Sequence, residues 1–595
     1  MAGTEIAKRV ALLRGFMSQH GLDAFVIPST DAHGSEYVPA HWESCKWISG
    51  FDGSAGTAVI TQSSAALWTD SRYFIAAAAQ LANTPFELMK ERVAGTPGIA
   101  EWLCSQLGEG SQVGIDGHVF SAAEAQSLQE ELQKKGIALN DQFDPMAAIW
   151  TDRPEIPTAE ISAQPLQYAG ESVASKTERL RQKLHEAGCD AMLVSALDEI
   201  AWLLNLRGED VHCNPVFVAY CLVNLSEVTL FVNKNKISEK VHSLLMRQGV
   251  IILPYESIEK SLSEMPSCRL LLPGSTNAAV KKAAGHCNVR MLPSPVALLK
   301  AVKNPTEIEG FCNAMLRDGV ALVKFLRWLK PAVTQGGVTE MGVDRKLTAL
   351  RAEQDLYKDI SFDTIAAYAE HGAIVHYEAT PETDCELKPE GFLLLDSGAQ
   401  YQDGTTDITR TISLGKPTAE ERRVYTLVLK GHIALSRAKY PEGTCGTQLD
   451  LAARYAMWQE GYNYGHGTGH GVGSYLNVHE GPHQIRMNHV PTPLAAGMTV
   501  TDEPGIYLEG KYGVRIENTL LVVPYRQTDF GNFLGFEPLT LCPIDTEPIE
   551  LEMLTPVEVK WLNDYHTEVC RKLMPLLYNE EDRQWLASAT QPLQK

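Results

Sequence analysis

The sequence predicts a protein of the α/β (α+β) class with three domains, of which the first two are related and the third is larger. One observation is a motif that occurs twice in the first half of the chain. Another is a proline-containing stretch between the two copies. The last is a change near residue 300, after which helical patterns alternate with glycine-rich β-hairpin patterns. The chain has 595 residues, enough to bury large cores without disulfides.

The repeated motif contains a helix, a glycine and a strand in the same order. The pattern Leu-Arg-x-x-(Met/Leu)-x-x-x-Gly-x-Asp-Ala begins at Leu13 and again at Leu180. Its glycine, Gly21 or Gly188, stands where helices commonly end in the left-handed conformation. A tryptophan and then a strand-like run follow each copy, at Trp47 with residues 57–61 and at Trp202 with residues 216–223. We therefore expect two related α/β domains in tandem.

We place the three domains at residues 1–155, 172–300 and 301–595. The residues between the first two, about 150–175, hold three prolines among polar residues and predict a linker. In the third domain, Asn304-Pro305-Thr306-Glu307 predicts the start of a long helix over residues 308–329. A second helical pattern over residues 557–577 predicts a C-terminal helical extension.

The composition excludes several functional classes. The chain has 73 acidic and 52 basic residues, a net charge of −21, which disfavours binding to nucleic acid or to anionic lipid. It contains no run of 18 apolar residues, and its amphipathic first helix lacks the apolar segment of a secretory signal. Its 12 cysteines include no C-x-x-C pair and indicate reduced thiols. We expect a cytoplasmic protein that binds neither nucleic acid nor membranes.

Two predicted hairpins in the third domain each carry a pair of carboxylates. Asp396 ends an apolar strand, and Asp407 precedes the strand that returns. Glu503 enters a second hairpin and Glu517 leaves it, on either side of a turn near Gly510. Taken alone, the first pair could serve as turn or cap residues, and the second could face solvent. The two pairs together indicate a cluster of four acids.

A glycine-rich segment with histidines lies between the two hairpins. Residues 465–473 read GHGTGHGVG and include His466 and His470, and His479 follows. The glycines exclude a helix, and with it a zinc pair at helical spacing, and the run does not fit G-x-G-x-x-G. Such a loop lets the backbone pack closely while it presents imidazoles.

The four acids and one imidazole form an oxygen-rich ligand set. Such a set favours Mn²⁺ or a similar ion over structural zinc, which prefers thiolates. Four carboxylates gathered together would repel one another unless cations were present, and two divalent ions match their charge. A centre with two such ions indicates hydrolysis.

The ordered set Asp396, Asp407, His470, Glu503 and Glu517 resembles the ligand signature of the pita-bread metallopeptidases, which include methionine aminopeptidases, prolidases and Xaa-Pro aminopeptidases. The segments DSGAQYQDGTTDITRT, GHGTGHGVGSYLNVHEGP and DEPGIY…GVRIEN resemble cytosolic Xaa-Pro aminopeptidases, also called aminopeptidase P. The repeated N-terminal half is similar to the creatinase-like domains of the three-domain members. The resemblance thus spans nearly the whole chain and implies a pita-bread catalytic domain at its end.

The resemblance also implies the roles of particular residues. The five ligands would hold two Mn²⁺ per subunit, with other divalent metals also able to serve. The implied catalytic residues are His376, His479 and Glu503. The implied substrate-binding residues are His376, His466, His479, Tyr507 and Arg515.

The reaction implied by the resemblance is removal of the N-terminal residue from peptides with proline at position 2. A hydroxide that bridges the two Mn ions would attack the Xaa-Pro carbonyl, and the enzyme would be a homodimer. One alternative is a prolidase, which cleaves Xaa-Pro dipeptides and usually has one N-terminal domain. Another is a non-catalytic pita-bread binding or chaperone module, which typically lacks metal ligands.

Asp70 and Arg72 could contact a substrate or equally form a structural ion pair.

Overall fold

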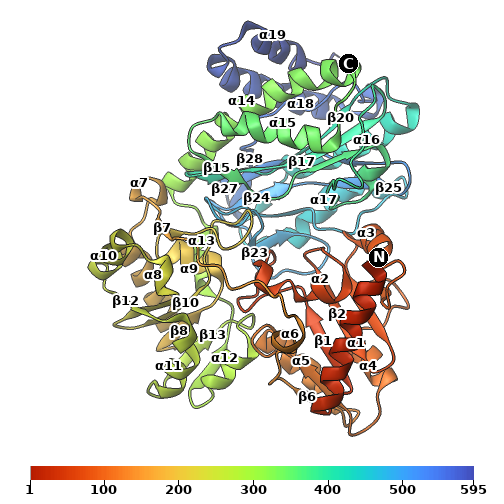
Figure 1. The fold of residues 1–595 in the computed structure, drawn as a ribbon. Helices are drawn as coiled ribbons and strands as arrows, with labels where there is room; N and C mark the ends of the chain where they lie inside the picture. Colours follow the sequence, from red (N-terminus) through yellow and green to blue (C-terminus); the bar gives the residue numbers. More distant parts are fainter. Residues whose placement is uncertain (1, 595) are drawn as a thin grey trace. The chain divides into compact units, whose positions relative to one another are not determined.

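The computed structural model of the protein describes residues 2–594, which form two compact units (Figure 1). The first unit consists of the chain up to Gln164 together with Glu171–Val296. The second consists of Pro165–Gly170 and the chain from Ala297 onward. The predicted linker is therefore not featureless, because its short helix α7 (Leu166–Ala169) packs on the second unit, where Asn304 Nδ2 donates to the Ala169 carbonyl at 2.8 Å.

The first unit contains two six-stranded sheets with the same strand order, β4-β3-β2-β1-β5-β6 and β12-β11-β10-β8-β13-β14. In each sheet three neighbouring strands pair antiparallel, and the remaining strands are added in parallel. The first sheet comprises β1 (Ala24–Pro28), β2 (Gly56–Thr61), β3 (Ala65–Thr69), β4 (Glu87–Lys90), β5 (Gln112–Ile115) and β6 (Ala138–Asn140). The second comprises β8 (Ala191–Val194), β10 (Ala219–Asn224), β11 (Val228–Val232), β12 (Val250–Leu253), β13 (Arg269–Leu272) and β14 (Asn288–Met291). The predicted tandem repeat is confirmed.

The helices that open the two repeats are α1 (Ala2–His20) and α8 (Val173–Glu186). Gly21 and Gly188 follow them with φ of 66° and 64°, the left-handed conformation that ends a helix without a Cβ clash. Leu13 and Leu180, at equivalent positions of the motif, are both fully buried. The repeat therefore preserves the packing of a helix on its sheet.

One predicted strand begins later than the sequence pattern indicates. The apolar run from Val216 enters β10 only at Ala219. The Asp210 backbone donates to the Val216 carbonyl at 3.1 Å, and the Val218 backbone donates to the Asp210 carboxylate at 2.7 Å. Residues 216–218 are thus hydrogen-bonded to a loop, and hydropathy alone does not reveal this.

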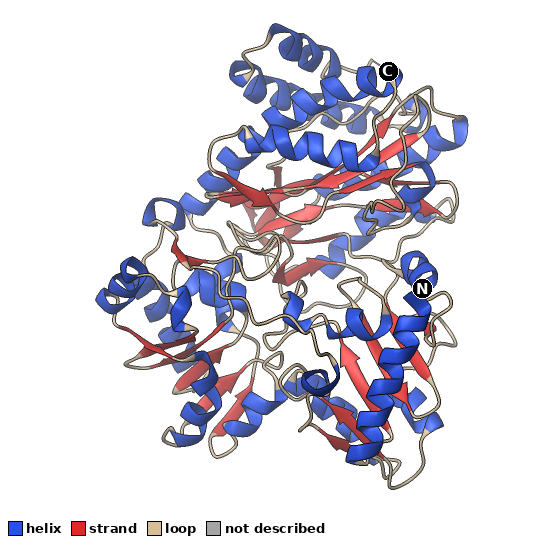
Figure 2. Cartoon of the chain, in the orientation of Figure 1, coloured by secondary structure: helices blue, strands red, loops and turns tan. Residues whose placement is uncertain are grey.

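The second unit consists of short antiparallel sheets with helices packed around them (Figure 2). The sheet orders are β15-β18-β19, β16-β17-β20, β21-β28-β27-β24, β22-β23 and β25-β26. The strands are β15 (Tyr357–Ile360), β16 (Ile365–Tyr368), β17 (Phe392–Ser397), β18 (Ala399–Tyr401), β19 (Gly404–Thr405), β20 (Ile408–Ser413), β21 (Lys439–Pro441), β22 (Gly469–Gly471), β23 (Glu480–Ile485), β24 (Thr499–Asp502), β25 (Gly505–Leu508), β26 (Tyr512–Arg515), β27 (Asn518–Thr528) and β28 (Gly531–Pro538).

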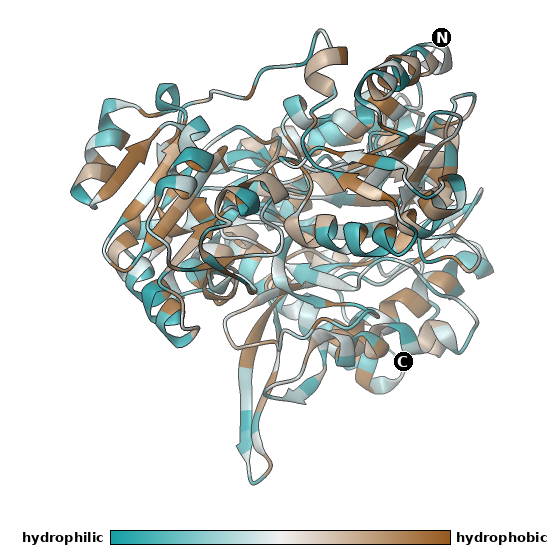
Figure 3. Cartoon of the chain, turned by 90° about the horizontal axis from the view of Figure 1, so that it is seen from below, coloured by the Kyte–Doolittle hydropathy of each residue, from teal (hydrophilic) through white to brown (hydrophobic). Residues whose placement is uncertain are grey.

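Besides α7, the longer helices of this unit are α14 (Pro305–Gln335), α15 (Glu340–Ala352), α16 (Ala419–Ser436), α17 (Gly446–Trp458), α18 (Pro556–Leu573) and α19 (Glu580–Ala589). The long helix predicted after residue 304 is α14, and Asn304 and Glu307 form the reciprocal capping box at its start. The predicted C-terminal helical extension is present as α18 and α19. Strands and helices both carry hydrophobic and hydrophilic residues (Figure 3). Among residues 2–594, none of the helices combines the length and the hydropathy that a membrane-spanning segment requires.

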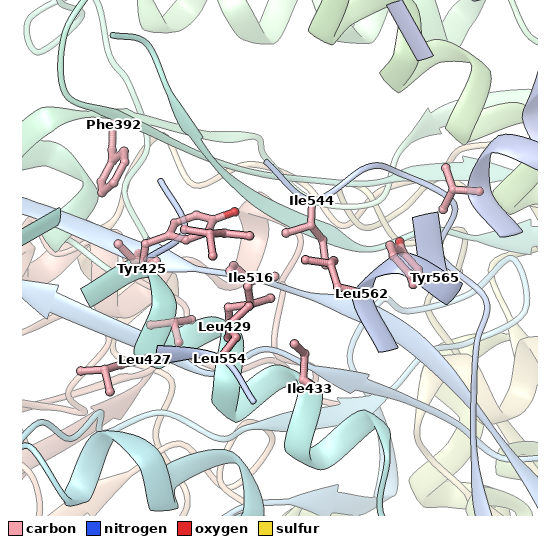
Figure 4. Close-up of a cluster of buried hydrophobic side chains, with 14 of the residues drawn as sticks. Phe392, Tyr425, Leu427, Leu429, Ile433, Ile516, Ile544, Leu554, Leu562 and Tyr565 are labelled. Carbon is pink, nitrogen blue, oxygen red and sulfur yellow. The ribbon is translucent and has the colours of Figure 1, made fainter. Parts of the chain in front are cut away.

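One large hydrophobic cluster supports the strands of the second unit (Figure 4). Phe392 at the start of β17 and Ile516 beside β26 belong to it, together with Tyr425 and Leu429 of α16 and Leu562 of α18. These side chains come from segments far apart in the sequence. Their packing therefore fixes where β17 and the segment after β26 lie relative to the helices.

We predict that Leu13→Ala destabilises the first unit by about 2–5 kcal/mol, because it leaves a cavity under α1. Leu12 is the matched control, since it is 53% exposed on the same helix, and Leu12→Ala should change the stability by less than about 0.5 kcal/mol. Urea unfolding followed by circular dichroism measures both changes. Equal losses for the two variants would contradict the buried helix face.

Candidate metal centre

The two predicted hairpins are present, and each carries its pair of acids at the ends of paired strands. In the first, β17 pairs antiparallel with β20, and Asp396 stands opposite Thr409. Asp407 directly precedes β20. In the second, β24 pairs with β27, so that Glu503 follows one strand and Glu517 precedes the other.

Alternation along the second hairpin separates its polar side chains from the core. Val514 and Ile516 are buried in the hydrophobic cluster, and Arg515 and Glu517 alternate with them. The backbone N–H of Glu517 donates to the Thr409 carbonyl at 3.0 Å, which joins the second hairpin to the first. The polar side of one hairpin is thereby held against the other.

The carboxylates and one imidazole converge at this junction. His470 Nε2 is 3.4 Å from Asp407 Oδ2 and 3.4 Å from Glu503 Oε1. Ligand atoms of Asp407, His470 and Glu517 all lie within 4.8 Å of one another. His470 is on β22, and its Nδ1 is 2.8 Å from the Gly471 carbonyl, an arrangement that keeps Nε2 available for the cluster.

Burial and mutual repulsion both favour the neutral forms of these acids. Desolvation raises the pKa of Asp407 well above its usual value, and the charges of Asp396 and Glu503 raise it further. Desolvation followed by the charges of Asp407, Glu503 and Asp396 likewise raises the pKa of Glu517. The pKa of Glu503 is raised to about 7, again mainly by desolvation. Divalent cations would stabilise the charged forms.

The donor set of the site fits a metal ion. Asp396 Oδ1 is buried and has no hydrogen-bond partner, although its other oxygen accepts from Arg515 Nη2 at 2.7 Å. A buried oxygen without a donor is costly unless a cation binds it. Four carboxylates and one imidazole suit a hard divalent ion such as Mn²⁺ better than they suit structural zinc, which prefers thiolate ligands.

A chain of hydrogen bonds leads from this cluster to His466. Arg515 Nη1 donates to the Tyr507 hydroxyl at 2.8 Å, and that hydroxyl is 2.7 Å from His466 Nε2. Arg515 also binds Asp396, as described above. His466, Tyr507 and Arg515 are therefore joined to one another and to a cluster carboxylate.

His479 and His376 lie on two further segments. The rings of His479 and His470 are 4.4 Å apart and nearly perpendicular. His376 is half-buried in the turn that follows the 3-10 helix η4 (Ala369–Ala373). Close backbone contact places η4 against β26, because a Cβ on Gly513 would lie 1.7 Å from the carbonyl oxygen of Gly372, which belongs to η4. Only glycine fits there, so the segment that carries His376 lies beside the strand that ends at Arg515.

Two threonine hydroxyl groups that hold the acids were not predicted from the sequence. Thr409 Oγ1 donates to Glu517 Oε2 at 2.8 Å, and Thr501 Oγ1 donates to Glu503 Oε1 at 3.2 Å. The alternating threonines in TTDITRT after Tyr401 are a signal that could have identified the first of these.

Asp70 and Arg72, whose role the sequence left open, pair with each other in the first unit. Arg72 Nη2 is 2.8 Å from Asp70 Oδ2, and Arg72 Nη1 is 3.3 Å from Glu36 Oε1. The ion-pair alternative is therefore the one that the structure contains.

Four family profiles match the chain. "Metallopeptidase family M24" matches residues 309–524, and "C-terminal region of peptidase_M24" matches residues 532–593. "Creatinase/Prolidase N-terminal domain" matches twice, at residues 9–146 and 152–307.

Known proteins match along nearly the whole chain. A probable Xaa-Pro aminopeptidase P of Laccaria bicolor is 42% identical and covers 98% of this chain and 93% of its own. Xaa-Pro aminopeptidase 1 of Dictyostelium discoideum is 40% identical, with coverage of 100% and 97%. The crystal structure of X-prolyl aminopeptidase from Caenorhabditis elegans, described as a cytosolic enzyme with a di-nuclear active site, has a TM-score of 0.95 at 36% identity and covers all of both chains.

The chain therefore belongs to metallopeptidase family M24, with the pita-bread fold in its second unit and creatinase-like domains in its first. Within that family it groups with the proteins named Xaa-Pro aminopeptidase, which it matches from end to end. The recognition from sequence and the predicted fold class are confirmed, and the chain is an enzyme.

We predict that Mn²⁺ stabilises the chain more strongly as the pH rises. The folded, metal-free state binds protons more tightly than the unfolded state, because the pKa of Glu503 rises from 4.5 to about 7 on folding. Its share of the stability is complete below about pH 4.5 and is lost as the pH rises through 7. Metal binding needs the deprotonated carboxylates, so the affinity for the metal increases over the same pH range.

Thermal unfolding of chelator-treated and Mn²⁺-saturated protein between pH 5 and 8 measures this difference. The gap between the two midpoints should widen with pH. A constant gap would contradict the assignment of these acids as ligands.

Proposed function

We propose that the protein removes the N-terminal residue from peptides that have proline at position 2, with two Mn²⁺ per subunit as its cofactor. The observation that carries the proposal is the convergence of two buried acids, Asp407 and Glu517, and the partly buried Glu503 on His470. Asp396, whose Oδ1 has no hydrogen-bond partner, is the fourth acid. Support comes from the relatives named Xaa-Pro aminopeptidase, with which the chain aligns along both N-terminal domains.

We assign the metal ligands within this cluster as follows. Asp396 would hold one cation, His470 and Glu503 would hold the other, and Asp407 and Glu517 would bridge the two. When bound, the cations would polarise the scissile carbonyl and lower the pKa of a water molecule. Arg515 orients Asp396, and the threonine hydroxyls orient the two glutamates, so the carboxylates are fixed before any cation arrives.

The other residues of the site would handle the substrate. His479, whose ring contacts that of His470, is in a position to stabilise charge that develops on the scissile carbonyl oxygen or to pass a proton to the leaving nitrogen. We also assign Glu503 a catalytic role, because its carboxylate, charged when a cation is bound, could accept a proton from the attacking water.

The proline ring would bind between His376, His466 and Tyr507. Ile374, two residues before His376, packs with Tyr507 in one small apolar cluster. A rigid tertiary amide with no N–H offers few hydrogen bonds, so an apolar surface is the better means of positioning it.

The two N-terminal domains favour an aminopeptidase over the prolidase alternative. The Xaa-Pro dipeptidase of Bacillus anthracis is 26% identical with a TM-score of 0.51, and it covers 63% of this chain although 99% of its own length is matched. More than a third of the present chain therefore has no counterpart in that dipeptidase. We further propose that the enzyme is cytoplasmic, as the C. elegans relative is described to be, and that it is a homodimer.

An assay with three peptides tests the proposal. We expect the Mn²⁺-loaded protein to cleave an Xaa-Pro-Xaa′ tripeptide efficiently, and an Xaa-Pro dipeptide or a Met-Ala peptide far less. Release of free N-terminal amino acid, measured by mass spectrometry, gives kcat/KM for each. Cleavage of the dipeptide without the tripeptide would replace this proposal with a prolidase, and no cleavage of any would favour a binding module.

The matched variants for this assay are Glu517→Ala and Glu509→Ala. Glu517 is a proposed bridging ligand, whereas Glu509 is exposed in the turn of the same hairpin. The first variant should lose nearly all turnover, and the second should retain it. Near-normal turnover in Glu517→Ala would refute the ligand assignment.

A further inference from the structure

A second group of residues whose side chains could hold a metal ion lies in the second unit, apart from the ligands assigned above. Glu340, His371 and Cys385 each offer one ligand atom, and these atoms lie within 4.8 Å of one another. His371 Nδ1 is 2.9 Å from Glu340 Oε1 and 3.9 Å from Cys385 Sγ. Ligands of a tetrahedral zinc ion, at about 2.0 Å for nitrogen and oxygen and 2.3 Å for sulfur, stand at roughly these separations from one another.

The backbone holds two of these residues in fixed register. The Glu340 N–H donates to the Cys385 carbonyl at 3.1 Å, and the Leu387 N–H donates to the Val338 carbonyl at 2.8 Å. The Met341 N–H donates to Asp384 Oδ1 at 2.9 Å. The start of α15 and the segment before β17 therefore form a short ladder that brings the carboxylate and the thiol together.

Hydrogen bonds from residues outside this cluster orient the Glu340 carboxylate, which is fully buried. Its Oε1 accepts from the Tyr368 backbone N–H at 2.7 Å, and its Oε2 accepts from the Tyr377 hydroxyl at 2.8 Å. Both oxygens also lie near His371 Nδ1, at 2.9 and 3.1 Å. Each oxygen thus has one outer donor and turns its other side toward His371, as metal-ligating carboxylates do.

Charge and ligand type identify the kind of cation. Glu340 as carboxylate and Cys385 as thiolate carry two negative charges, which match a divalent ion. A thiolate is a soft ligand that Zn²⁺ and Co²⁺ accept, whereas Mn²⁺ prefers oxygen. Three protein ligands would leave the fourth position of a tetrahedral ion to water.

We propose that Glu340, His371 and Cys385 bind one zinc-class cation in addition to the two of the peptidase centre. Binding releases two protons to solvent, one from the Cys385 thiol and one from His371 Nδ1, which keeps the ring neutral with its remaining proton on Nε2. The bound cation links η4, which contains His371, to the start of α15, which contains Glu340. Because His376 follows η4 by three residues, the bound cation anchors the segment that leads to this histidine.

Titration of the full-length chain with Co²⁺ tests the site, because a thiolate bound to Co²⁺ gives a charge-transfer absorption in the near ultraviolet. The ligands proposed for the peptidase centre include no thiol, so that centre is silent in this measurement. We expect the absorption in the native chain, its loss in Cys385→Ser and a weaker band in His371→Ala. Cys312, which is exposed, supplies the matched control, and Cys312→Ser should retain the band.

The same titration separates this inference from the proposed function. Glu517→Ala should keep the band while it loses peptidase activity. No band in the native chain, or a band that persists in Cys385→Ser, would overturn the inference whatever the activity.

Alkylation of the native chain gives a second measurement that needs no variant. Free Zn²⁺ at ten times its Kd should slow the reaction of Cys385 with iodoacetamide about tenfold, because only the unbound fraction reacts. Peptide mass spectrometry compares Cys385 with Cys312, whose rate should not change. Equal rates for Cys385 with and without Zn²⁺ would contradict the site.

Discussion

The second unit brings together carboxylates that are largely buried and that repel one another, and the arrangement of its site follows from the need to offset this repulsion. Asp407 and Glu517 are almost completely buried, and the pKa of each is raised, first by desolvation and then by the charges of neighbouring carboxylates. Such a cluster persists only if protons or cations neutralise it. The surrounding groups fit cations, since Arg515 and the two threonine hydroxyls orient carboxylate oxygens and leave Asp396 Oδ1 without a donor.

The fold meets this constraint with strand alternation and a rigid core. Val514 and Ile516 are anchored in the large hydrophobic cluster, so Arg515 and Glu517 have a fixed direction. Glycines let separate segments come close enough to share the site, most clearly where Gly372 passes Gly513. The positions of these carboxylates therefore depend on apolar packing as well as on their own hydrogen bonds.

Much of the fold could be predicted from local sequence. The offset between Leu13 and Leu180 indicated two equivalent domains, and their sheets have the same strand order. The acids could be assigned to one cluster because the alternation of polar and apolar residues along each hairpin is visible in the sequence. The start of β10 and the hydroxyl partners of the acids depend on contacts between distant segments, which no local pattern encodes. The cluster of Glu340, His371 and Cys385 was missed for the same reason, since the first two are 31 positions apart in the chain.

The proposed chemistry requires the converging acids to hold two cations rather than one or none. Anomalous diffraction at the manganese absorption edge, from crystals of the Mn²⁺-loaded protein, distinguishes these cases. We expect two peaks, both in contact with Asp407 and Glu517, one beside Asp396 and the other beside His470 and Glu503. A single peak, or peaks that do not touch these carboxylates, would contradict it.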